Sequence, residues 1–188
     1  MTPEELMALS ASLAERSARL GWGGPFGAVI AKDGEVIASA SNTVLLTGDI
    51  TAHAEVQAIR KAVQVLNPYA PSISEVQQDD STLTLIPRDP GSPDPMPERA
   101  QMLAGYEIYA SGFPCPMCMG AIYWARISTL YYACSVEQTR EIGFDDAFQY
   151  EDFAKPLDER RIPIHRIGED AGLTAYRAWQ EKADKHPY

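Results

Sequence analysis

The sequence predicts an α/β fold with a mixed central sheet, and two patterns carry that prediction. Asp33-Gly34 separates two apolar runs, which is typical of a two-residue hairpin between antiparallel strands. Residues 106–110, 115–126 and 129–134 have the patterns of a strand, a helix and a strand, as in a right-handed βαβ crossover between parallel strands. Both kinds of strand pairing in a chain of 188 residues indicate one domain around a mixed sheet.

The chain is expected to begin with a helix followed by the hairpin. Thr2-Pro3-Glu4-Glu5 has the residues of a capping box with proline at the first helical position. Leucines then recur at helical spacing as far as Leu20, and Gly21 is the expected end of the helix. The two hairpin strands are expected at residues 26–31 and 35–41.

The next expected element is a helix from about His53 to Leu66. Thr51 can cap its start, and Asn67-Pro68 ends it. Residues 68–105 are rich in proline and poor in apolar sequence. We therefore interpret them as a surface insertion rather than a second domain, since they lack the residues for a core of their own.

The C-terminal quarter is expected to contain little regular structure before its last helix. A helical turn follows Glu137, and residues 143–156 form an acidic, aromatic stretch that we interpret as a loop. Residues 162–164 are expected to be extended, and residues 169–182 have the pattern of a closing helix.

The charge balance disfavours a polynucleotide substrate. The chain carries 16 Lys and Arg residues against 26 Asp and Glu residues, a formal net charge of −10. Proteins that bind DNA or tRNA use clusters of basic residues, and Arg160-Arg161 is the strongest basic cluster in this sequence. We therefore expect a small-molecule substrate and no nucleic-acid partner.

The sequence also predicts a cytoplasmic protein with no membrane contact. Apolar runs fall well short of the roughly 20 residues that span a bilayer, and the first five residues are acidic where a secretory signal is basic. Three cysteines do not make a disulfide framework. Cys134, in an apolar β-like run, is expected to be buried.

Two short motifs have the residues of a zinc site, His53-Ala54-Glu55 and Pro114-Cys115-Pro116-Met117-Cys118. An imidazole and two thiolates suit tetrahedral Zn²⁺, and three protein ligands leave the fourth position open, as in catalytic sites. Cys115 and Cys118 lie three residues apart at a helix start, where the helix dipole lowers the pKa of thiols. We therefore predict His53, Cys115 and Cys118 as zinc ligands.

Glu55 lies two residues from a predicted ligand, where a carboxylate can move a proton from the attacking water to the departing amine. The pattern H-x-E followed by P-C-x-x-C is typical of zinc nucleobase deaminases. Taken alone, C-x-x-C also fits a redox dithiol, and a single His in a helix is usually a packed or surface residue. The joint pattern favours a hydrolytic zinc site over both alternatives.

Two further features can belong either to a binding site or to ordinary connections. The glycines around Phe26 let the backbone approach a flat ligand closely, with the Phe26 ring beside it, but they also suit a plain loop. Asn42 at the end of a strand can contact a substrate or serve as a turn residue. The residues alone leave both alternatives open.

Five segments together resemble the cytidine deaminase superfamily and, within it, the bacterial guanine deaminases. They are Gly23–Ile30, Thr51–Val56, Pro114–Cys118, Gly120–Arg126 and Ile142–Asp146. The zinc motifs are shared by the whole superfamily, whereas Gly-Phe-Asp-Asp and the terminal Tyr are more discriminating. The resemblance implies a three-layer α/β/α fold and a homodimer that exchanges a C-terminal segment from about residue 143.

The resemblance also implies roles for individual residues beyond the zinc ligands and the Glu55 proton shuttle. Asn42 would hydrogen-bond the purine, Phe26 and Trp124 would pack around its ring, and Asp146 would assist a second proton transfer. Tyr188 would close the site of the partner subunit. The chain departs from the family at Phe113, where a Glu is usual.

The sequence therefore predicts zinc-dependent hydrolysis of guanine to xanthine and ammonia. A deaminase for another amino heterocycle, such as cytosine, adenine, adenosine or the aminotriazine ammeline, is the nearest alternative. Deamination of tRNA adenosine is a further alternative that the acidic charge disfavours. A binding protein with a purely structural zinc is the alternative outside enzymes.

Overall fold

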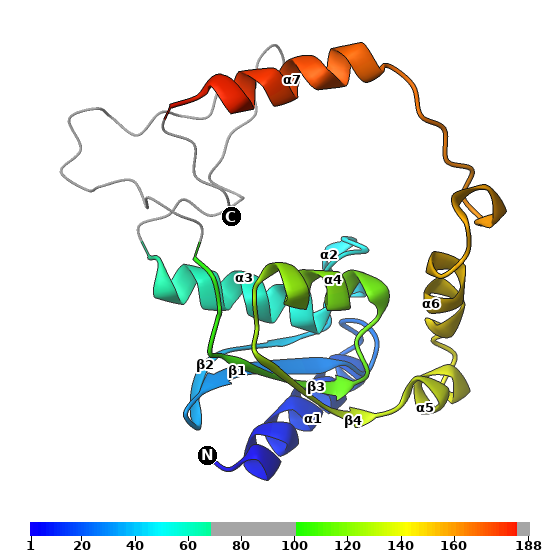
Figure 1. The fold of residues 1–188 in the computed structure, drawn as a ribbon. Coiled ribbons are helices and arrows are strands. Elements are labelled where there is room, and N and C mark those ends of the chain that lie inside the picture. The colour runs from blue at the N-terminus through cyan, green and yellow to red at the C-terminus, as the bar shows by residue number, and fades with distance from the viewer. Residues whose placement is uncertain (69–100, 184–188) are drawn as a thin grey trace.

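The computed structural model describes residues 1–68 and 101–183, which form a four-stranded mixed sheet between layers of helices (Figure 1). The strands are β1 (Gly27–Lys32), β2 (Glu35–Ser41), β3 (Glu107–Gly112) and β4 (Thr129–Cys134). Their order is β2-β1-β3-β4, with β1 antiparallel to β2 and β3, and β3 parallel to β4. The predicted mixed sheet, hairpin and parallel crossover are confirmed.

The hairpin turn has the backbone geometry that Asp33-Gly34 predicts. Both residues have positive φ, 50° at Asp33 and 78° at Gly34, as the two central positions of a type I′ turn require. Its twist matches that of the flanking strands, so the turn sets the register in which Lys32 pairs with Glu35. A register shift between Ile30 and Ala31 then brings Gly27 opposite Ser41.

Helix α1 (Pro3–Arg19) covers one face of the sheet. The predicted capping box at residues 2–5 is formed by its side chains and backbone amides. Leu6 packs against Val29 and Tyr109, which point to this face from neighbouring strands. Because side chains alternate along a strand, the residues between them face the other layer.

Helices α3 (Ala54–Leu66) and α4 (Pro116–Trp124) cover the opposite face (Figure 1). Ile30 and Ile108 of the sheet pack in one core cluster with Ala58 and the other fully buried alanines of α3. Small side chains let the helix lie close to the sheet. The layers on both faces confirm the predicted α/β/α fold.

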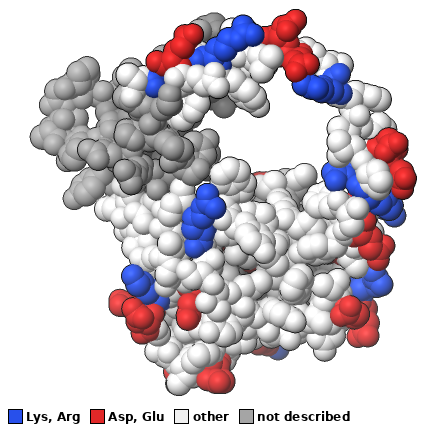
Figure 2. Space-filling view, in the orientation of Figure 1, with Lys and Arg blue, Asp and Glu red and all other residues white. Residues whose placement is uncertain are grey.

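The remaining elements are short or lie outside this core. They are α2 (Val44–Thr47), α5 (Val136–Glu141), α6 (Ala147–Phe153), a 3₁₀ turn (Leu157–Glu159) and α7 (Glu169–Glu181). Every residue of α7 is exposed, and the chain leading to it stands away from the sheet (Figures 1 and 2).

Two expectations about the C-terminal half are wrong. Residues 143–156 were expected to form a loop, but seven of them form α6, since acidic and aromatic residues gave no visible apolar stripe there. Cys134 is exposed rather than buried, because it ends the edge strand β4, most of whose residues are exposed. Residues 162–164 form no strand of the sheet in the described chain.

Most of the predicted insertion, residues 69–100, lies outside the described residues. The single-domain organisation and the exchanged C-terminal segment stay predictions. No helix in the described ranges is long and apolar enough to cross a membrane. Figure 2 shows Lys and Arg side chains scattered among Asp and Glu on the face drawn.

Candidate metal centre and active site

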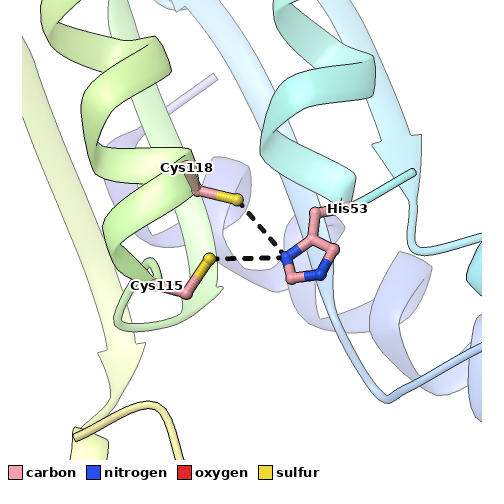
Figure 3. Close-up of side chains that lie close together, drawn as sticks. All are labelled: His53, Cys115 and Cys118. Atoms are coloured by element: carbon pink, nitrogen blue, oxygen red, sulfur yellow. Dashed lines mark hydrogen bonds between the residues drawn. The ribbon is translucent and has the colours of Figure 1, made fainter. Parts of the chain in front are cut away.

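The three predicted metal ligands meet between the starts of α3 and α4. His53 is the N-cap residue of α3, Cys115 is the N-cap residue of α4, and Cys118 lies in the first turn of α4. Figure 3 shows both sulfurs pointing at the imidazole, with Nδ1 3.6 Å from Cys115 Sγ and 3.5 Å from Cys118 Sγ. Two segments 62 residues apart in the chain thus form one cluster of donor atoms.

The cluster has the dimensions of a zinc site. Tetrahedral Zn²⁺ with Zn–S near 2.3 Å and Zn–N near 2.0 Å separates nitrogen from sulfur by about 3.6 Å. The two observed nitrogen–sulfur distances match this separation, and all three donor atoms lie within 4.8 Å of one another. A shared imidazole favours a metal site over the redox dithiol alternative.

Both arms of the cluster begin with an extended residue followed by a helix. Cys115 has ψ of 166° and His53 has ψ of 151°, so each side chain projects ahead of the free backbone amides of the first turn. Proline at position 116 suits the first turn, because its missing N–H would have no partner there. The expectation that Thr51 caps α3 is wrong, since its backbone N–H and hydroxyl both donate to Asp49.

The protonation of the two thiols differs in the protein chain alone. A hydrogen bond from the Cys118 thiol, and next His53, lower the pKa of Cys115 to about 4. The same hydrogen bond, together with burial, raises the pKa of Cys118. The hydrogen bond with Cys115 also raises the pKa of His53. One thiolate is therefore already formed at neutral pH, and the second thiol holds a proton that a bound cation would displace.

Glu55 lies directly beside the cluster, in the first turn of α3. Its side chain is buried, with 6% of its surface exposed, and its Oε2 accepts a hydrogen bond from Cys118 Sγ at 3.4 Å. Burial is the main cause that raises the pKa of this carboxyl. A carboxyl whose pKa lies closer to neutrality is better able both to take and to give a proton.

A cavity of about 560 Å³ opens onto this cluster. Its lining includes six residues predicted from the sequence, namely Phe26, Asn42, His53, Glu55, Cys115 and Asp146. The volume lies within the range of small-molecule sites. The cavity therefore suits a single small ligand with its reacting atom near the metal cluster.

Asn42 is held in one orientation inside the cavity. It is only 3% exposed, and its Oδ1 accepts the Val44 N–H at 3.1 Å. Its backbone carbonyl accepts the Ser17 hydroxyl at 2.6 Å. A Cβ atom at Gly23 would lie 2.0 Å from Oδ1, so glycine there makes room for this amide. Because Oδ1 is engaged, the amide NH₂ is the end available to a ligand.

Asp146 lies at the N-cap of α6 and lines the same cavity. Desolvation is the first cause that raises its pKa, and the nearby Cys115 is the second. The structure thus brings a second carboxyl toward the metal cluster from a different part of the chain than Glu55.

Several cavity residues escaped the sequence reasoning. Phe144 meets Phe26 edge to face, with ring centroids 5.1 Å apart. Gln149 and Ile50 also line the cavity, as does Phe113, which the sequence had marked as a departure from the family. Helical spacing from Asp146 would have identified Gln149, but only after α6 had been recognised as a helix.

Two predicted substrate residues are not placed at the cavity of the described chain. Trp124 is 64% exposed at the end of α4 and lines a separate shallow surface with Tyr123 and Arg126. Tyr188 lies outside the described residues. The roles proposed for both stay predictions.

Comparison with known proteins gives a consistent set of similarities. The family model of the cytidine and deoxycytidylate deaminase zinc-binding region matches residues 1–134. Guanine deaminase of Bacillus subtilis is 39% identical over 188 residues, which cover 100% of each sequence. Its X-ray structure is similar with a TM-score of 0.79 and 38% identity, covering 100% of this chain and 99% of that one. The tRNA-specific adenosine deaminase of Agrobacterium fabrum is 32% identical over 57% of this chain and 50% of its own.

The sequence, the fold and the donor cluster therefore agree. The family match includes both zinc motifs, and the full-length similarity confirms the predicted resemblance to bacterial guanine deaminases. The chain belongs to the zinc-binding family of cytidine and deoxycytidylate deaminases, which are hydrolases acting on C–N bonds.

Proposed function

We propose that this protein converts guanine to xanthine and ammonia by zinc-dependent hydrolysis. The observation that carries the proposal is full-length similarity to a guanine deaminase, combined with a cavity that ends at a His-Cys-Cys cluster. The reaction adds water at the amino-bearing C2 of guanine and releases that amino group. It needs no redox cofactor.

His53, Cys115 and Cys118 would hold the zinc ion, and their donor distances support that role. When bound, Zn²⁺ supplies Lewis acidity that makes water a stronger nucleophile near neutral pH. The helix starts that carry the ligands favour the thiolate form of the cysteines. The two thiolates carry two negative charges, which offset the charge of a divalent ion.

Glu55 would act as the proton carrier of the reaction. It would pass one proton of the attacking water to a ring nitrogen of guanine, and then pass the second proton, left on the new C2 hydroxyl, to the departing amine. Its burial beside Cys118 supports this role, because it leaves the carboxyl facing the reacting atoms rather than bulk water. Asp146, on the α6 side of the cavity, would assist the second proton transfer.

The purine would be held between an amide and an aromatic wall. The NH₂ group of Asn42 would donate to an acceptor atom of the base, since its carbonyl oxygen is already engaged by a backbone amide. Phe26, fixed edge to face against Phe144, would pack against the ring. Trp124 would add a further ring contact.

We also propose a cytoplasmic homodimer that exchanges its C-terminal segment. Leu173, Tyr176 and Trp179 recur along α7 and are all exposed, and an exchanged segment would bury such a row against a second copy. Tyr188 would then reach the site of the partner. The three free cysteines suit a reducing compartment.

Ammonia release over a panel of substrates tests the proposed function. We expect turnover of guanine and little turnover of cytosine, adenine, adenosine or ammeline. Turnover of another base without guanine would keep the chemistry and refute the substrate. A zinc-containing protein that deaminates none of them would support a structural role for the metal instead.

A further inference from the structure

Three side chains of α6 and its N-cap lie along one face of the helix, and two of them line the active-site cavity. Asp146, Gln149 and Tyr150 lie at positions i, i+3 and i+4, which share one side of a helix. Asp146 and Gln149 line the cavity. Tyr150 instead fastens the helix to the loop that carries the first metal ligand.

Tyr150 connects α6 to the loop before Cys115 through one hydrogen bond and through aromatic packing. The Tyr150 hydroxyl donates to the carbonyl oxygen of Pro114 at 2.7 Å, directly before Cys115 in the chain. The Tyr150 ring lies 6.0 Å from the ring of Phe113, which meets Tyr132 edge to face at 5.1 Å. These contacts fix where the cavity side of α6 lies relative to the metal ligands.

The amide of Gln149 has a definite orientation at this wall. Its Nε2 donates to Asp146 Oδ1 at 3.4 Å, and a carboxylate can only accept, so the NH₂ end faces Asp146. The carbonyl oxygen Oε1 is then the end that can accept a hydrogen bond from a ligand. Asn42 has the opposite arrangement, with its NH₂ end available.

The cavity therefore has an amide donor from the β2 end and an amide acceptor from α6. Phe113, where the family usually has a Glu, is apolar and lines the same cavity. An apolar ring there accepts no hydrogen bond from a base, which leaves polar recognition near it to α6.

We propose that Gln149 is a specificity-determining residue whose Oε1 accepts a hydrogen bond from an N–H group of the substrate base. This inference rests on the proposed function, since guanine offers N–H donors on its ring. Gln149 thereby supplies polar contact at a wall where Phe113 supplies none. A neutral hydrogen bond of this kind is worth about 2- to 12-fold in affinity.

Gln149→Met tests the proposal, because methionine keeps the length of the side chain without a strong acceptor. We expect KM for guanine to rise about 2- to 12-fold, with kcat within about twofold of wild type. In a Glu55→Gln background, where guanine turnover should be about 10²- to 10⁴-fold slower, rapid filtration with labelled guanine should show the same loss of affinity. Glu151→Met places the same side chain on the exposed side of α6 and should change neither value.

The outcomes separate this inference from the proposed function. Unchanged KM and affinity in Gln149→Met would overturn the substrate contact. A fall in kcat with unchanged affinity would also overturn it, since Gln149 would then act only by orienting Asp146. Absence of guanine turnover in the wild type would instead refute the proposed function. Zinc content and melting temperature, measured on each variant, exclude a folding defect as the cause.

Discussion

Residues 1–134 and residues 135–183 contribute to the same cavity in different ways. The first region holds the metal ligands and Glu55 on helix starts that pack against the sheet, with Cys118 fully buried. The second region contributes Phe144, Asp146 and Gln149 from short elements that are mostly exposed. The family match covers the first region alone.

The difference is one of anchoring, because each region holds groups of both kinds: Asn42 and Phe26 lie in the first region and Asp146 in the second. Groups that move protons or hold a cation need fixed positions, which burial between packed helices and strands provides. Groups that distinguish one heterocycle from another can lie on short, mostly exposed elements. A few contacts, such as the hydrogen bond from Tyr150 to Pro114, are enough to position these elements. We therefore expect substitutions at the metal ligands and Glu55 to abolish the reaction, and a substitution at Gln149 to change its substrate dependence.

The largest effect is expected from removing one metal ligand in the first region. Cys118→Ala should abolish zinc binding and reduce activity below detection, because a site with two protein ligands neither holds the ion nor orients water. Zinc content by atomic absorption and ammonia release measure the two losses. Cys134→Ala is the matched control, since this cysteine is exposed at the end of β4 and should keep both. Full activity in Cys118→Ala would contradict the assigned ligand set.

The next effect is expected at the proton carrier. Glu55→Gln should lower kcat by about 10²- to 10⁴-fold, the usual contribution of general acid–base catalysis, while zinc stays bound. Glu141→Gln, at an exposed position of α5, should leave kcat unchanged. A loss smaller than tenfold in Glu55→Gln would mean that another group carries the proton.

The first region is also where sequence reasoning succeeds. The capping box at Thr2, the Asp33-Gly34 turn and the strand–helix–strand pattern are local signals, and each element they predict is formed. The metal cluster was predictable because the spacing of Cys115 and Cys118 fixes both sulfurs on one helical turn. A zinc site of this kind needs a third donor, and the His53-Ala54-Glu55 motif identifies it as His53.

The second region shows what sequence reasoning misses. Residues 147–153 form a helix without a side-chain cap, and their aromatic and acidic residues give no clear apolar stripe. Gln149 and Phe144 enter the cavity only because tertiary contacts place α6 there. One failure lies at the end of the first region: the exposure of Cys134 depends on what covers β4, which an apolar run in the sequence does not show.

Zinc binding should depend on pH in a way that reports the thiol protonation of the first region. At neutral pH Cys115 is already a thiolate, because its pKa is lowered to about 4, whereas the raised pKa of Cys118 keeps that thiol protonated. Binding must therefore release the Cys118 proton, and above the raised pKa of His53, where the imidazole is already neutral, affinity should rise about tenfold per pH unit. Calorimetry in buffers of different ionisation enthalpy counts the protons. At pH 8, release of two thiol protons would show that Cys115 is not ionised beforehand.

A smaller effect is expected at Gly23, which makes room for the Asn42 amide that we expect to contact the substrate. Gly23→Ala would place a Cβ atom 2.0 Å from Asn42 Oδ1, so the amide must shift. Loss of one or two hydrogen bonds predicts a rise in KM of about tenfold, with zinc content unchanged. Gly120→Ala is the control, because a Cβ atom in this part of α4 meets nothing within 4 Å. Equal KM values in the two variants would remove Asn42 from substrate recognition.

The smallest effect is expected from a substitution in α7. It tests whether the exposed side chains of this helix become buried in a dimer in solution. Trp179 is 45% exposed, and its burial by a second copy would contribute on the order of 1 kcal/mol. Trp179→Ser should then weaken the dimer about fivefold in sedimentation equilibrium, since a large apolar side chain is lost from the exchanged segment. Glu181→Ser, two residues further along the same helix, should leave the dimer unchanged. A wild-type protein that sediments as a monomer would contradict the exchange, and recognition would then depend on a single chain.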